Sequence, residues 1–573
     1  MPHVVSPHGG SLVDLMVNPS RRAELRDDAV NYPSWRLTHR QLYDLELLAT
    51  GGFSPLRGFM GFADYAAVCE SMRLADGTLW PIPITLDLPE GAVRAAERSG
   101  ALALRDREGV MVGTLRLSQA WKPDRLAEAR AVFGTTNEAH PGVEHLLHGS
   151  NPWYVAGQLE VLEPFHHCDF PELRRTPVQL RAEFVRRGWK RVVAFNTRNP
   201  MHRAHLELTL RGAREADAKL LIHPVVGLTQ PGDVDYHTRV RCYQALLPSY
   251  PPDTAMVSLL PLAMRMAGPR EALWHALIRQ NYGATHFIIG RDHAGPRPDL
   301  TGVPFYHPYA AQELLQRHEA ELGIQIVKFQ RMVYLADSGT YVEESEAPAG
   351  LPVLQISGTD LRARLALGAD VPAWFTVPAV ADELRRRFRA RADQGFTVFF
   401  TGLSGAGKST IARSLVEKLS ELADRSVSLL DGDEVRQQLS SELGFSREDR
   451  DRHVRRIGYV AAEITKSGGV AVCAPIAPYA AARRDVRRMV EAGGGFVLVY
   501  VDTPLDICEK RDRKGLYAKA RAGVVSQFTG VSDGYDEPKD ADIVVDFTQT
   551  PDEASQRILE YLREMGYLPV PPA

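Results

Sequence analysis

The sequence predicts a multidomain α/β protein, and three observations lead to this prediction. The chain has 573 residues, more than one hydrophobic core usually supports, so at about 100 to 200 residues per domain we expect about three or four units. Short apolar runs alternate with helix-like stretches over much of its length, which is typical of parallel sheets. A glycine-rich loop, Gly402–Ser409, follows one such run and opens a helix-like segment.

Composition and charge argue against several classes of protein. Hydrophobic residues make up 44% and charged residues 24% of the chain, ordinary proportions for a globular protein. A formal net charge of -3 gives no global field that would draw the chain onto nucleic acid or a membrane surface. There is no apolar run long enough to span a membrane, and the N-terminus lacks the pattern of a signal peptide. We therefore expect a cytoplasmic protein with neither a nucleic-acid nor a membrane partner.

Five cysteines are scattered without a Cys-x-x-Cys pair or zinc-like spacing, which favours reduced structural thiols.

The first two-thirds of the chain divides by pattern into two parts. Residues 1–168 are expected to form a β-rich module, because runs such as 80–88 and 110–117 alternate apolar and polar residues between turn residues. Residues 169–390 are expected to form a parallel α/β domain, whose buried strands are three apolar runs separated by helix-like stretches, at 191–195, 220–224 and 286–290.

A charged, arginine-rich stretch at 381–393 precedes a new apolar run at 396–400. The arginines fit either a nucleic-acid patch or a solvated helix face beside a linker, and the second interpretation is favoured. The sequence thus predicts a boundary here and a C-terminal domain over 394–573.

The glycine-rich loop has the spacing of a phosphate-binding loop between a strand and a helix. Its backbone N–H groups and the helix N-terminus favour phosphate, Lys408 reaches the outer phosphates, and the Ser409 hydroxyl can ligate Mg²⁺. A ligand-free glycine turn is the alternative, and the strand–loop–helix context argues against it. The expected ATP-binding residues are Gly402, Leu403, Ser404, Gly405, Ala406, Gly407, Lys408, Ser409 and Thr410.

Two carboxylates, Asp431 and Asp433, follow the apolar run at 426–430. Ligand sites form at the carboxyl ends of parallel strands, so these side chains favour a catalytic site over a surface turn. We expect Asp431 to hold the metal together with Ser409, and Asp433 to take a proton from an attacking hydroxyl.

The whole stretch 394–573 resembles adenylylsulfate (APS) kinases. The resemblance rests on the loop, on Asp431-Gly-Asp433, and on further motifs at 444–446, 449–451, 455–458, 501–504, 514–523 and 528–530. It implies transfer of the ATP γ-phosphate to the 3′-hydroxyl of APS. By position it implies that two arginines hold the phosphosulfate, that two phenylalanines sandwich the adenine, and that 514–523 form a lid. The implied APS-binding residues are Asp433, Arg436, Phe445, Arg450, His453, Ile476, Lys519 and Phe528.

This stretch departs from the kinase pattern at two positions. His453 stands where relatives often have asparagine, so this substrate contact is expected either to differ in donor pattern or to titrate near neutrality. Ala477 stands where many relatives have a serine proposed as a phosphorylated intermediate. Because Ala477 has no hydroxyl, we expect transfer directly from ATP to APS.

Two histidines, His202 and His205, begin a helix after the run 191–195 and share one helical face. From the residues alone, metal binding, a structural pair and a phosphate contact are equally open. The block 196–205 resembles the Thr-Arg-Asn-Pro and His-x-x-His pattern of ATP sulfurylases, in the nucleotidylyltransferase superfamily. Further matches stand at 223–227, 231–235 with Thr238-Arg239, 290–296, and 356–359 before Arg362.

The sulfurylase resemblance covers residues 1–390 and implies a PUA-like N-terminal module and a Rossmann-like central domain. It implies attack of sulfate on the ATP α-phosphorus, with release of pyrophosphate. Sulfate has no proton to remove, so such a site needs positioning and charge stabilisation. Arg198 and the Ala294 backbone would bind sulfate, and His202 and His205 would stabilise phosphate charge. The remaining implied ATP contacts are Asn196, Thr197, Asn199, Gly290, Arg291, Asp292, His293 and Val333.

Asn196 replaces the usual glutamine of sulfurylases, and Gln230 stands where relatives often have lysine, which predicts the loss of a phosphate contact. The main hypothesis is a bifunctional enzyme, similar to PAPS synthetases, that uses ATP, sulfate, APS and pyrophosphate with Mg²⁺ and forms a homo-oligomer, a dimer or hexamer. One alternative is a sulfurylase with a non-catalytic, PAPS-binding regulatory C-terminal domain. Another is a sulfurylase that runs in the ATP-forming direction.

Overall fold

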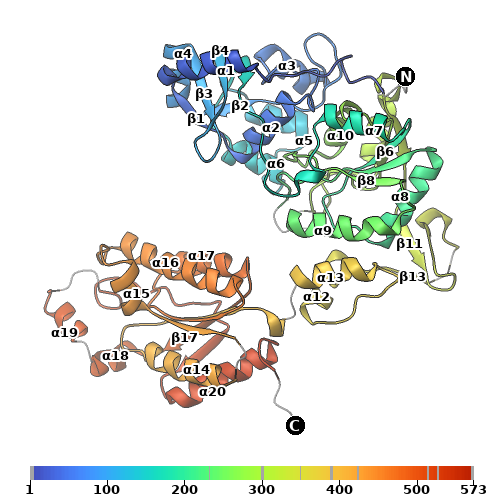
Figure 1. Ribbon diagram of the computed structural model, residues 1–573. Coiled ribbons are helices and arrows are strands. Elements are labelled where there is room, and N and C mark those ends of the chain that lie inside the picture. Colours follow the sequence, from blue (N-terminus) through green and yellow to red (C-terminus); the bar gives the residue numbers. More distant parts are fainter. Residues whose placement is uncertain are drawn as a thin grey trace. The chain divides into compact units, whose positions relative to one another are not determined.

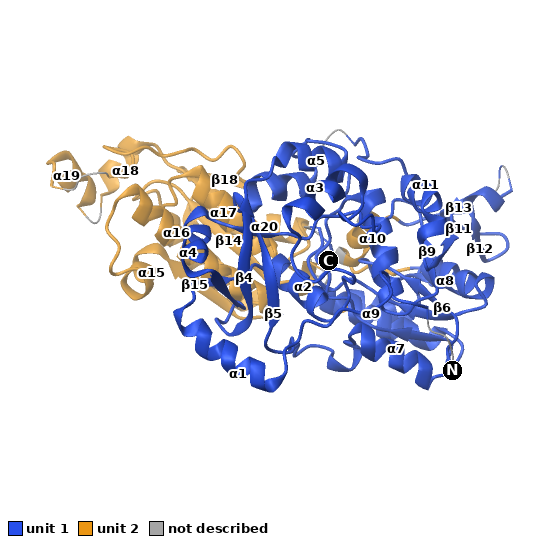
Figure 2. Ribbon diagram, turned by 90° about the horizontal axis from the view of Figure 1, so that it is seen from above, with its two compact units in different colours: residues 1–356, 372–384 blue, residues 357–371, 385–573 orange. Residues whose placement is uncertain are grey.

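A computed structural model describes residues 5–230, 233–298, 302–348, 350, 352–387, 391–422, 425–512, 515–524 and 528–569. The chain divides into two compact units, coloured separately in Figure 2. The first contains residues 1–356 and 372–384, and the second contains residues 357–371 and 385–573. No helix of the described part is long and apolar enough to cross a membrane.

The N-terminal part of the first unit is built on a five-stranded mixed sheet (Figure 1). Only β1 and β3 are parallel, and the other neighbours are antiparallel. The strands, in sheet order, are β1 (Ser34–Arg36), β3 (Ala101–Arg105), β4 (Met111–Trp121), β5 (Trp153–Val161) and β2 (Leu86–Leu88). The helices are α1 (Pro19–Asp28), α2 (His39–Ala49), α3 (Phe62–Ser71), α4 (Glu90–Ser99), α5 (Arg125–Phe133) and α6 (Pro141–Glu144).

The strand predicted over 80–88 is wrong in its first half, because only Leu86–Leu88 pairs as β2. Pro81 and Pro83 lack the N–H that a sheet ladder requires. The backbone there bonds singly to other segments: Trp80 N donates to Met72 O at 2.8 Å, and Ile84 O accepts from Met60 N at 2.8 Å.

The central sheet is parallel, as predicted, in the order β10-β9-β6-β7-β8. Its core strands are almost wholly apolar because both faces are buried. The strands are β6 (Val192–Phe195), β7 (Lys219–Ile222), β8 (Ala255–Val257), β9 (His286–Ile289) and β10 (Gln325–Lys328). The helices are α7 (Pro177–Arg186), α8 (Arg203–Glu215), α9 (Tyr236–Leu246), α10 (Gly268–Asn281) and α11 (Ala310–Arg317). The strand order reverses between β6 and β9, where ligand crevices form in such sheets.

The β-rich part and the central sheet share one hydrophobic core. Phe53 packs against Trp274 of α10 with ring centroids 5.1 Å apart. Arg265 Nη2 donates to Asp44 Oδ2 at 2.6 Å, and both side chains are almost fully buried. The N-terminal part is therefore packed as a section of the same body.

A small antiparallel sheet follows, in the order β12-β11-β13. Its strands are β11 (Met332–Leu335), β12 (Thr340–Glu343) and β13 (Val353–Leu354), and it is followed by α12 (Gly358–Ala366) and α13 (Pro378–Arg387). Val380, Ala381 and Leu384 are buried in α13 while residues 385–387 are exposed. The exposure of these three residues is compatible with a solvated helix face, which stays a prediction, and 388–390 lie outside the described part.

The second unit contains a five-stranded, fully parallel sheet in the order β15-β16-β14-β17-β18, as predicted. The strands are β14 (Phe396–Thr401), β15 (Val427–Asp431), β16 (Val470–Ala474), β17 (Gly495–Asp502) and β18 (Ile543–Asp546). The helices are α14 (Lys408–Leu422), α15 (Gly432–Leu439), α16 (Arg447–Lys466), α17 (Ala480–Glu491), α18 (Leu505–Arg511), α19 (Leu516–Arg521) and α20 (Pro551–Glu564). The glycine-rich loop leaves the central strand β14 and enters α14.

Candidate active sites

The central candidate site lies at the carboxyl ends of β6 and β9, from which the segments 196–199 and 290–295 emerge. Two residues of the second segment, Asp292 and Ala294, have φ of 54° and 57°. L residues rarely adopt this left-handed backbone, and such strain is concentrated at functional sites. The adjacent strands thus bring most of the predicted sulfurylase residues to one edge of the sheet.

Asn196 is held by other protein groups on both sides of its amide. Its Oδ1 accepts from the fully buried Arg279, and its Nδ2 lies 3.4 Å from His275 Nδ1. Arg279 also donates to His223 O at 3.1 Å. Burial lowers the pKa of Arg279 to about 9, so it stays charged at neutral pH. Asn196 is thereby bound into a buried network beneath the loop.

A second buried chain joins Glu271, His275 and His293. The Glu271 carboxylate accepts from the backbone N–H groups of Arg265 and Ala267 at 2.9 Å each, and its Oε1 lies 3.5 Å from His275 Nε2. His275 Nδ1 lies 3.1 Å from His293 Nε2. Burial is the main cause that lowers the pKa of both histidines, so both are neutral at pH 7.

The network assigns the tautomers of this chain. Asn196 Nδ2 can only donate to His275 Nδ1, so this Nδ1 is an acceptor and His275 carries its proton on Nε2, on the side of Glu271. His293 must then donate from Nε2, which leaves His293 Nδ1 as an acceptor. His293 therefore offers a lone pair, not a positive charge, to a ligand. No sequence motif marks Glu271 or His275, because their contacts with His293 and Asn196 arise only from the tertiary fold.

His202 and His205 lie at the start of α8, as predicted, with His202 as its N-cap. Burial, with the neighbouring His205, lowers the pKa of His202 to about 3, and burial lowers that of His205 to about 4. The backbone N–H of His202 donates to His205 Nδ1 at 3.2 Å, which puts the His205 proton on Nε2. These rings can stabilise phosphate as hydrogen-bond donors, not as cations.

Thr197 and Asn199 fix the turn after β6. Thr197 Oγ1 accepts from Asn199 N at 3.1 Å, and Tyr243 donates to Asn199 O at 2.9 Å. Among the other predicted nucleotide contacts, Arg291 is exposed and pairs with Asp292 at 3.1 Å. Val333 is buried on β11, whose strand packs against α8.

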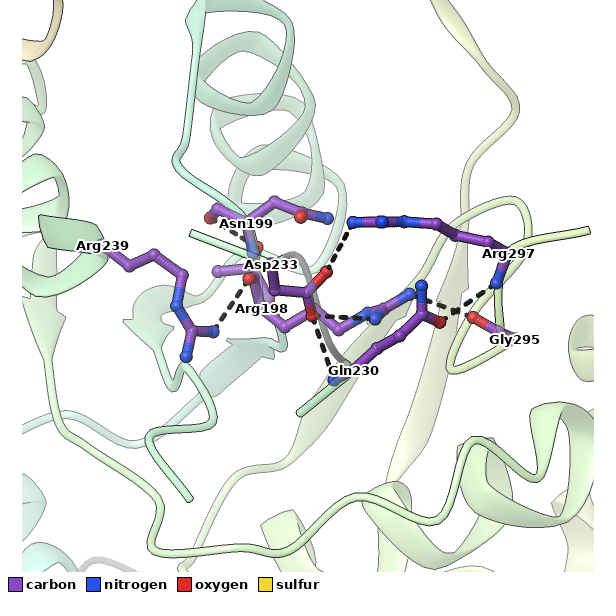
Figure 3. Close-up of polar contacts among 8 residues, drawn as sticks. Arg198, Asn199, Gln230, Asp233, Arg239, Gly295 and Arg297 are labelled. Atoms are coloured by element: carbon purple, nitrogen blue, oxygen red, sulfur yellow. Dashed lines mark hydrogen bonds and ion pairs between the residues drawn. The ribbon is translucent and has the colours of Figure 1, made fainter. Parts of the chain in front are cut away.

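Arg198 is bound by an aspartate of the same unit (Figure 3). Its Nη1 donates to Asp233 Oδ2 at 3.0 Å, and its Nη2 donates to Gly295 O at 3.0 Å. Arg239 Nη1 donates to the Arg198 carbonyl at 2.8 Å. The predicted sulfate-binding arginine thus lies beside the 290–295 segment, as expected, but its guanidinium already has a carboxylate partner.

The C-terminal candidate site is a pocket of about 710 Å³ at the carboxyl ends of β14 and β15. It brings residues of the glycine-rich loop together with Asp431 and Asp433. Gly402, Gly405 and Gly407 all have positive φ, and a Cβ at Gly402 would lie 2.7 Å from Val501 O. Lys408 Nζ donates to Gly402 O and Leu403 O at 2.8 and 2.7 Å. The loop therefore has the conformation that only glycine permits at these positions.

The predicted APS-binding residues divide into two groups. Asp433, Arg436, Phe445, Arg450, His453, Ile476 and Phe528 line this pocket. Lys519 of α19 is exposed and is not part of the lining, and Lys514 lies outside the described residues. Phe528 is buried, whereas Phe445 is 60% exposed with the Arg436 guanidinium 4.8 Å from its ring centroid.

Arg450, like Arg198, is paired with a carboxylate. Its Nη1 donates to Asp533 Oδ2 and to Thr529 Oγ1, both at 2.7 Å. Tyr479 also donates to Asp533. The sequence did not reveal Asp533 because 83 residues separate it from Arg450.

The surroundings of His453 distinguish between the two expectations for it, an altered donor pattern and titration near neutrality. Burial, with the positive charge of Arg436, lowers the pKa of His453 to about 4, so titration near neutrality is wrong. Its Nε2 lies 3.0 Å from Gly432 O and donates to that carbonyl, which leaves Nδ1 buried as an acceptor that has no partner among the described residues. The donor pattern is therefore what distinguishes His453.

Three comparisons relate the chain to known proteins. Family models match residues 5–164 (PUA-like domain), 171–387 (ATP-sulfurylase) and 394–546 (adenylylsulphate kinase). A sulfate adenylyltransferase from Phaeosphaeria nodorum is 53% identical over 548 residues, 95% of this chain and 96% of that one. One from Chaetomium globosum is 51% identical over 568 residues, 98% of this chain and 99% of that one.

A solved structure described as the hexameric APS kinase from Thiobacillus denitrificans is 40% identical, with a TM-score of 0.80. The match covers 99% of this chain and 100% of that chain. Together these matches confirm the predicted fold class: a PUA-like module, a central sulfurylase domain and a C-terminal phosphate-loop domain.

Proposed function

Because this chain belongs to the sulfate adenylyltransferase family and carries ATP-sulfurylase and APS kinase domains, we propose that it activates sulfate in two steps. The first forms APS and pyrophosphate from ATP and sulfate, and the second phosphorylates the APS 3′-hydroxyl to give PAPS. The domains are proposed to extend over 1–168, 169–390 and 394–573. Pyrophosphate-releasing formation of APS is unfavourable, and phosphorylation of APS draws it forward by mass action.

In the first step the protein supplies positioned donors and no strong base. Sulfate, held by Arg198 and the Ala294 backbone, attacks the ATP α-phosphorus, and charge develops on the departing pyrophosphate. His205 presents a neutral Nε2–H for that charge, because its Nδ1 is occupied by the His202 backbone. Donors that are already oriented cost no reorganisation in the transition state. His293 accepts a hydrogen bond from a donor group of the nucleotide.

The second step is supported chiefly by one observation: a single pocket joins an intact phosphate loop, Asp431, Asp433 and the aromatic residues Phe445 and Phe528. Lys408 and the loop N–H groups bind the ATP phosphates, and Asp433 accepts the proton of the attacking hydroxyl. Arg436 and Arg450 hold the phosphosulfate. A regulatory C-terminal domain without activity would have no need of this full set.

The residues of the pocket fit Mg²⁺ bound with ATP. The described residues include no cluster of three or more His, Cys, Asp or Glu placed to hold a metal. In phosphoryl-transfer sites, however, Mg²⁺ takes one or two protein ligands together with substrate phosphates and waters. Ser409 and Asp431 line the same pocket and would hold the ion, which neutralises phosphate charge. Asp431 is oriented for this by accepting from Asp433 N at 3.0 Å.

Ala477 makes the kinase step a direct transfer. It is buried at the pocket with a φ of 46°, and its carbonyl accepts from Arg483 at 2.8 Å and Thr401 at 3.1 Å. A methyl side chain offers no nucleophile, so this position cannot carry the phosphoryl group.

The test is to assay each half-reaction on the purified full chain. With APS and γ-labelled ATP we expect labelled PAPS, and its absence would assign the C-terminal domain a regulatory role. Sulfate-dependent pyrophosphate release from ATP is expected as well. If only ATP formation from APS and pyrophosphate were found, the sulfurylase would be an ATP-forming enzyme. Light scattering on the same sample tests the proposed homo-oligomer, for which the hexameric relative favours six chains over two.

A further inference from the structure

Gln230, which replaces a common lysine of the sulfurylases, has a definite structural task. Its side chain is buried, and its Oε1 accepts from the backbone N–H of Arg297 at 3.1 Å. Its own backbone N–H donates to Asp233 Oδ2 at 3.3 Å. The glutamine therefore connects the segment that carries Arg297 to the segment that carries Asp233 (Figure 3).

Arg297 and Arg198 share one carboxylate. Arg198 Nη1 lies 3.0 Å from Asp233 Oδ2, and Arg297 Nη2 lies 3.3 Å from Asp233 Oδ1. The Asp233 side chain is 6% exposed, that of Arg198 17% and that of Arg297 51%. One guanidinium thus approaches from inside the site and the other from its solvent side, on opposite oxygens of a single anion.

The charges explain why a second cation belongs here. Arg198 and Asp233 together are neutral, so they give a sulfate dianion no net attraction, and the aspartate repels it. The Arg297 guanidinium adds a positive charge on the other side of Asp233. Guanidinium groups suit tetrahedral oxyanions as well as carboxylates, because they present donors in a planar fork.

We propose that Arg297 is the second cation of the sulfate subsite, held in place by Gln230. This inference rests on the proposed sulfurylase function. Asp233 lies between the two guanidinium groups and holds them apart. The substrate sulfate, or the sulfate group of APS, competes with the Asp233 carboxylate for their N–H donors. Arg297 binds and orients the anion, and the chemistry at phosphorus is unchanged.

The test compares Arg297→Ala with the unmodified chain in both directions of the reaction. We expect the KM for sulfate and the KM for APS to rise about tenfold, since a hydrogen bond between charged partners is lost. The KM values for ATP and pyrophosphate should stay within about twofold. Arg73→Ala is the matched control, because Arg73 is a partly exposed arginine paired with Glu321 at 2.8 Å elsewhere in the same unit.

Moving the positive charge from position 297 to position 230 distinguishes a role in sulfate binding from that of a structural ion pair. In Gln230→Lys/Arg297→Ala the lysine restores the cation beside Asp233, so the KM for sulfate should recover at least half of the logarithmic loss. Arg297→Lys should also retain most of the affinity. A structural ion pair alone would instead give a lower melting temperature with unchanged KM values.

The outcomes are distinguishable. If the unmodified chain lacks sulfurylase activity in both directions, the proposed function fails. If it is active and Arg297→Ala leaves the KM for sulfate and APS unchanged, or raises the KM for pyrophosphate instead, the assignment of Arg297 to sulfate is wrong. Failure of the lysine variant to recover sulfate affinity in a folded protein would also overturn it.

Discussion

His275 Nδ1 lies 3.1 Å from His293 Nε2, and this contact connects the buried Glu271–His275 pair to a residue of the proposed nucleotide site. Glu271 fixes one end of the chain through two backbone N–H groups. Asn196, which donates to His275 Nδ1, and Glu271, which lies 3.5 Å from His275 Nε2, both favour the His275 tautomer that leaves His293 Nδ1 as an acceptor. We expect Glu271 and His275 to act as positioning residues.

Glu271→Gln should impair ATP binding more than sulfate binding. The amide can donate to His275 Nε2, which favours the opposite tautomer and sets the His275 Nδ1 proton against the His293 Nε2 proton. We expect the KM for ATP to rise about tenfold, because the hydrogen bond that His293 Nδ1 accepts from the nucleotide is lost. Steady-state kinetics with each substrate varied measures this, and Glu271→Asp should recover part of the loss. Equal changes in both KM values would indicate a general packing defect.

Lys408→Ala should abolish PAPS formation and spare the sulfurylase. Loss of a positioned cationic donor at the phosphates is expected to lower the kinase kcat about 10² to 10³-fold. Labelled PAPS production measures the loss, while pyrophosphate release reports the sulfurylase. Lys418→Ala is the control, since Lys418 lies on the same helix and pairs with Asp552 at 2.9 Å away from the pocket. Normal PAPS formation by Lys408→Ala would refute the assignment.

Arg198→Ala should have the opposite effect. Sulfate-dependent pyrophosphate release is expected to fall about 10² to 10³-fold, because a donor to the reacting anion is lost. PAPS formation from supplied APS should be unaffected. Arg187→Ala, which removes an arginine paired with Glu183 at 2.7 Å, is the control. If a folded Arg198→Ala protein lost both activities, the picture of two independent sites would be wrong.

Glu128→Gln should stabilise the first unit increasingly as the pH rises. Tyr65 and Tyr154 both donate to Glu128 Oε2 at 3.0 Å, and burial is the main cause that raises the pKa of Glu128 to about 7. A pKa raised on folding contributes stability below about pH 4.5, and this stability is lost as the pH rises to about 7. The shift corresponds to about 3 kcal/mol. Calorimetry from pH 4.5 to 8 measures the melting temperature of variant and parent.

Glu160→Gln provides a control of opposite sign. Hydrogen bonds from Arg21 are the main cause that lowers the pKa of Glu160, so this carboxylate contributes stability above its unfolded pKa and loses it in acid. The variant should therefore be more destabilised at pH 7 than at pH 4. Parallel slopes for the two variants would contradict both assignments.

The sequence was sufficient for features that depend on local pattern. The apolar runs at β6, β7, β9, β14 and β15 appear as strands within one or two residues of their predicted ends, because a buried parallel strand needs a continuous apolar run. The phosphate loop was equally predictable from the sequence, since its backbone geometry requires glycine at fixed positions. The strand prediction over 80–88 was wrong in its first part because Pro81 and Pro83 cannot donate the hydrogen bonds of a sheet, even though apolar and polar residues alternate there.

Contacts between distant residues were not predictable in the same way. Asp233 stands in a recognised motif, yet nothing local shows that it pairs with Arg198, 35 residues away. Asp533 and Glu271 carry no motif, and their roles depend on which segments the fold brings together. The shared core of the N-terminal part and the central sheet likewise follows from shape complementarity, for which one sequence holds no signal.

The methyl side chain of Ala477 also has a stereochemical consequence. A phosphoryl group that moves once, in line, from ATP to APS arrives with inverted configuration at phosphorus, whereas two successive transfers through an enzyme hydroxyl would retain it. ATP made chiral at its γ-phosphorus with oxygen isotopes should therefore yield PAPS of inverted configuration. A chain with serine at this position has a second route open to it, and this one does not.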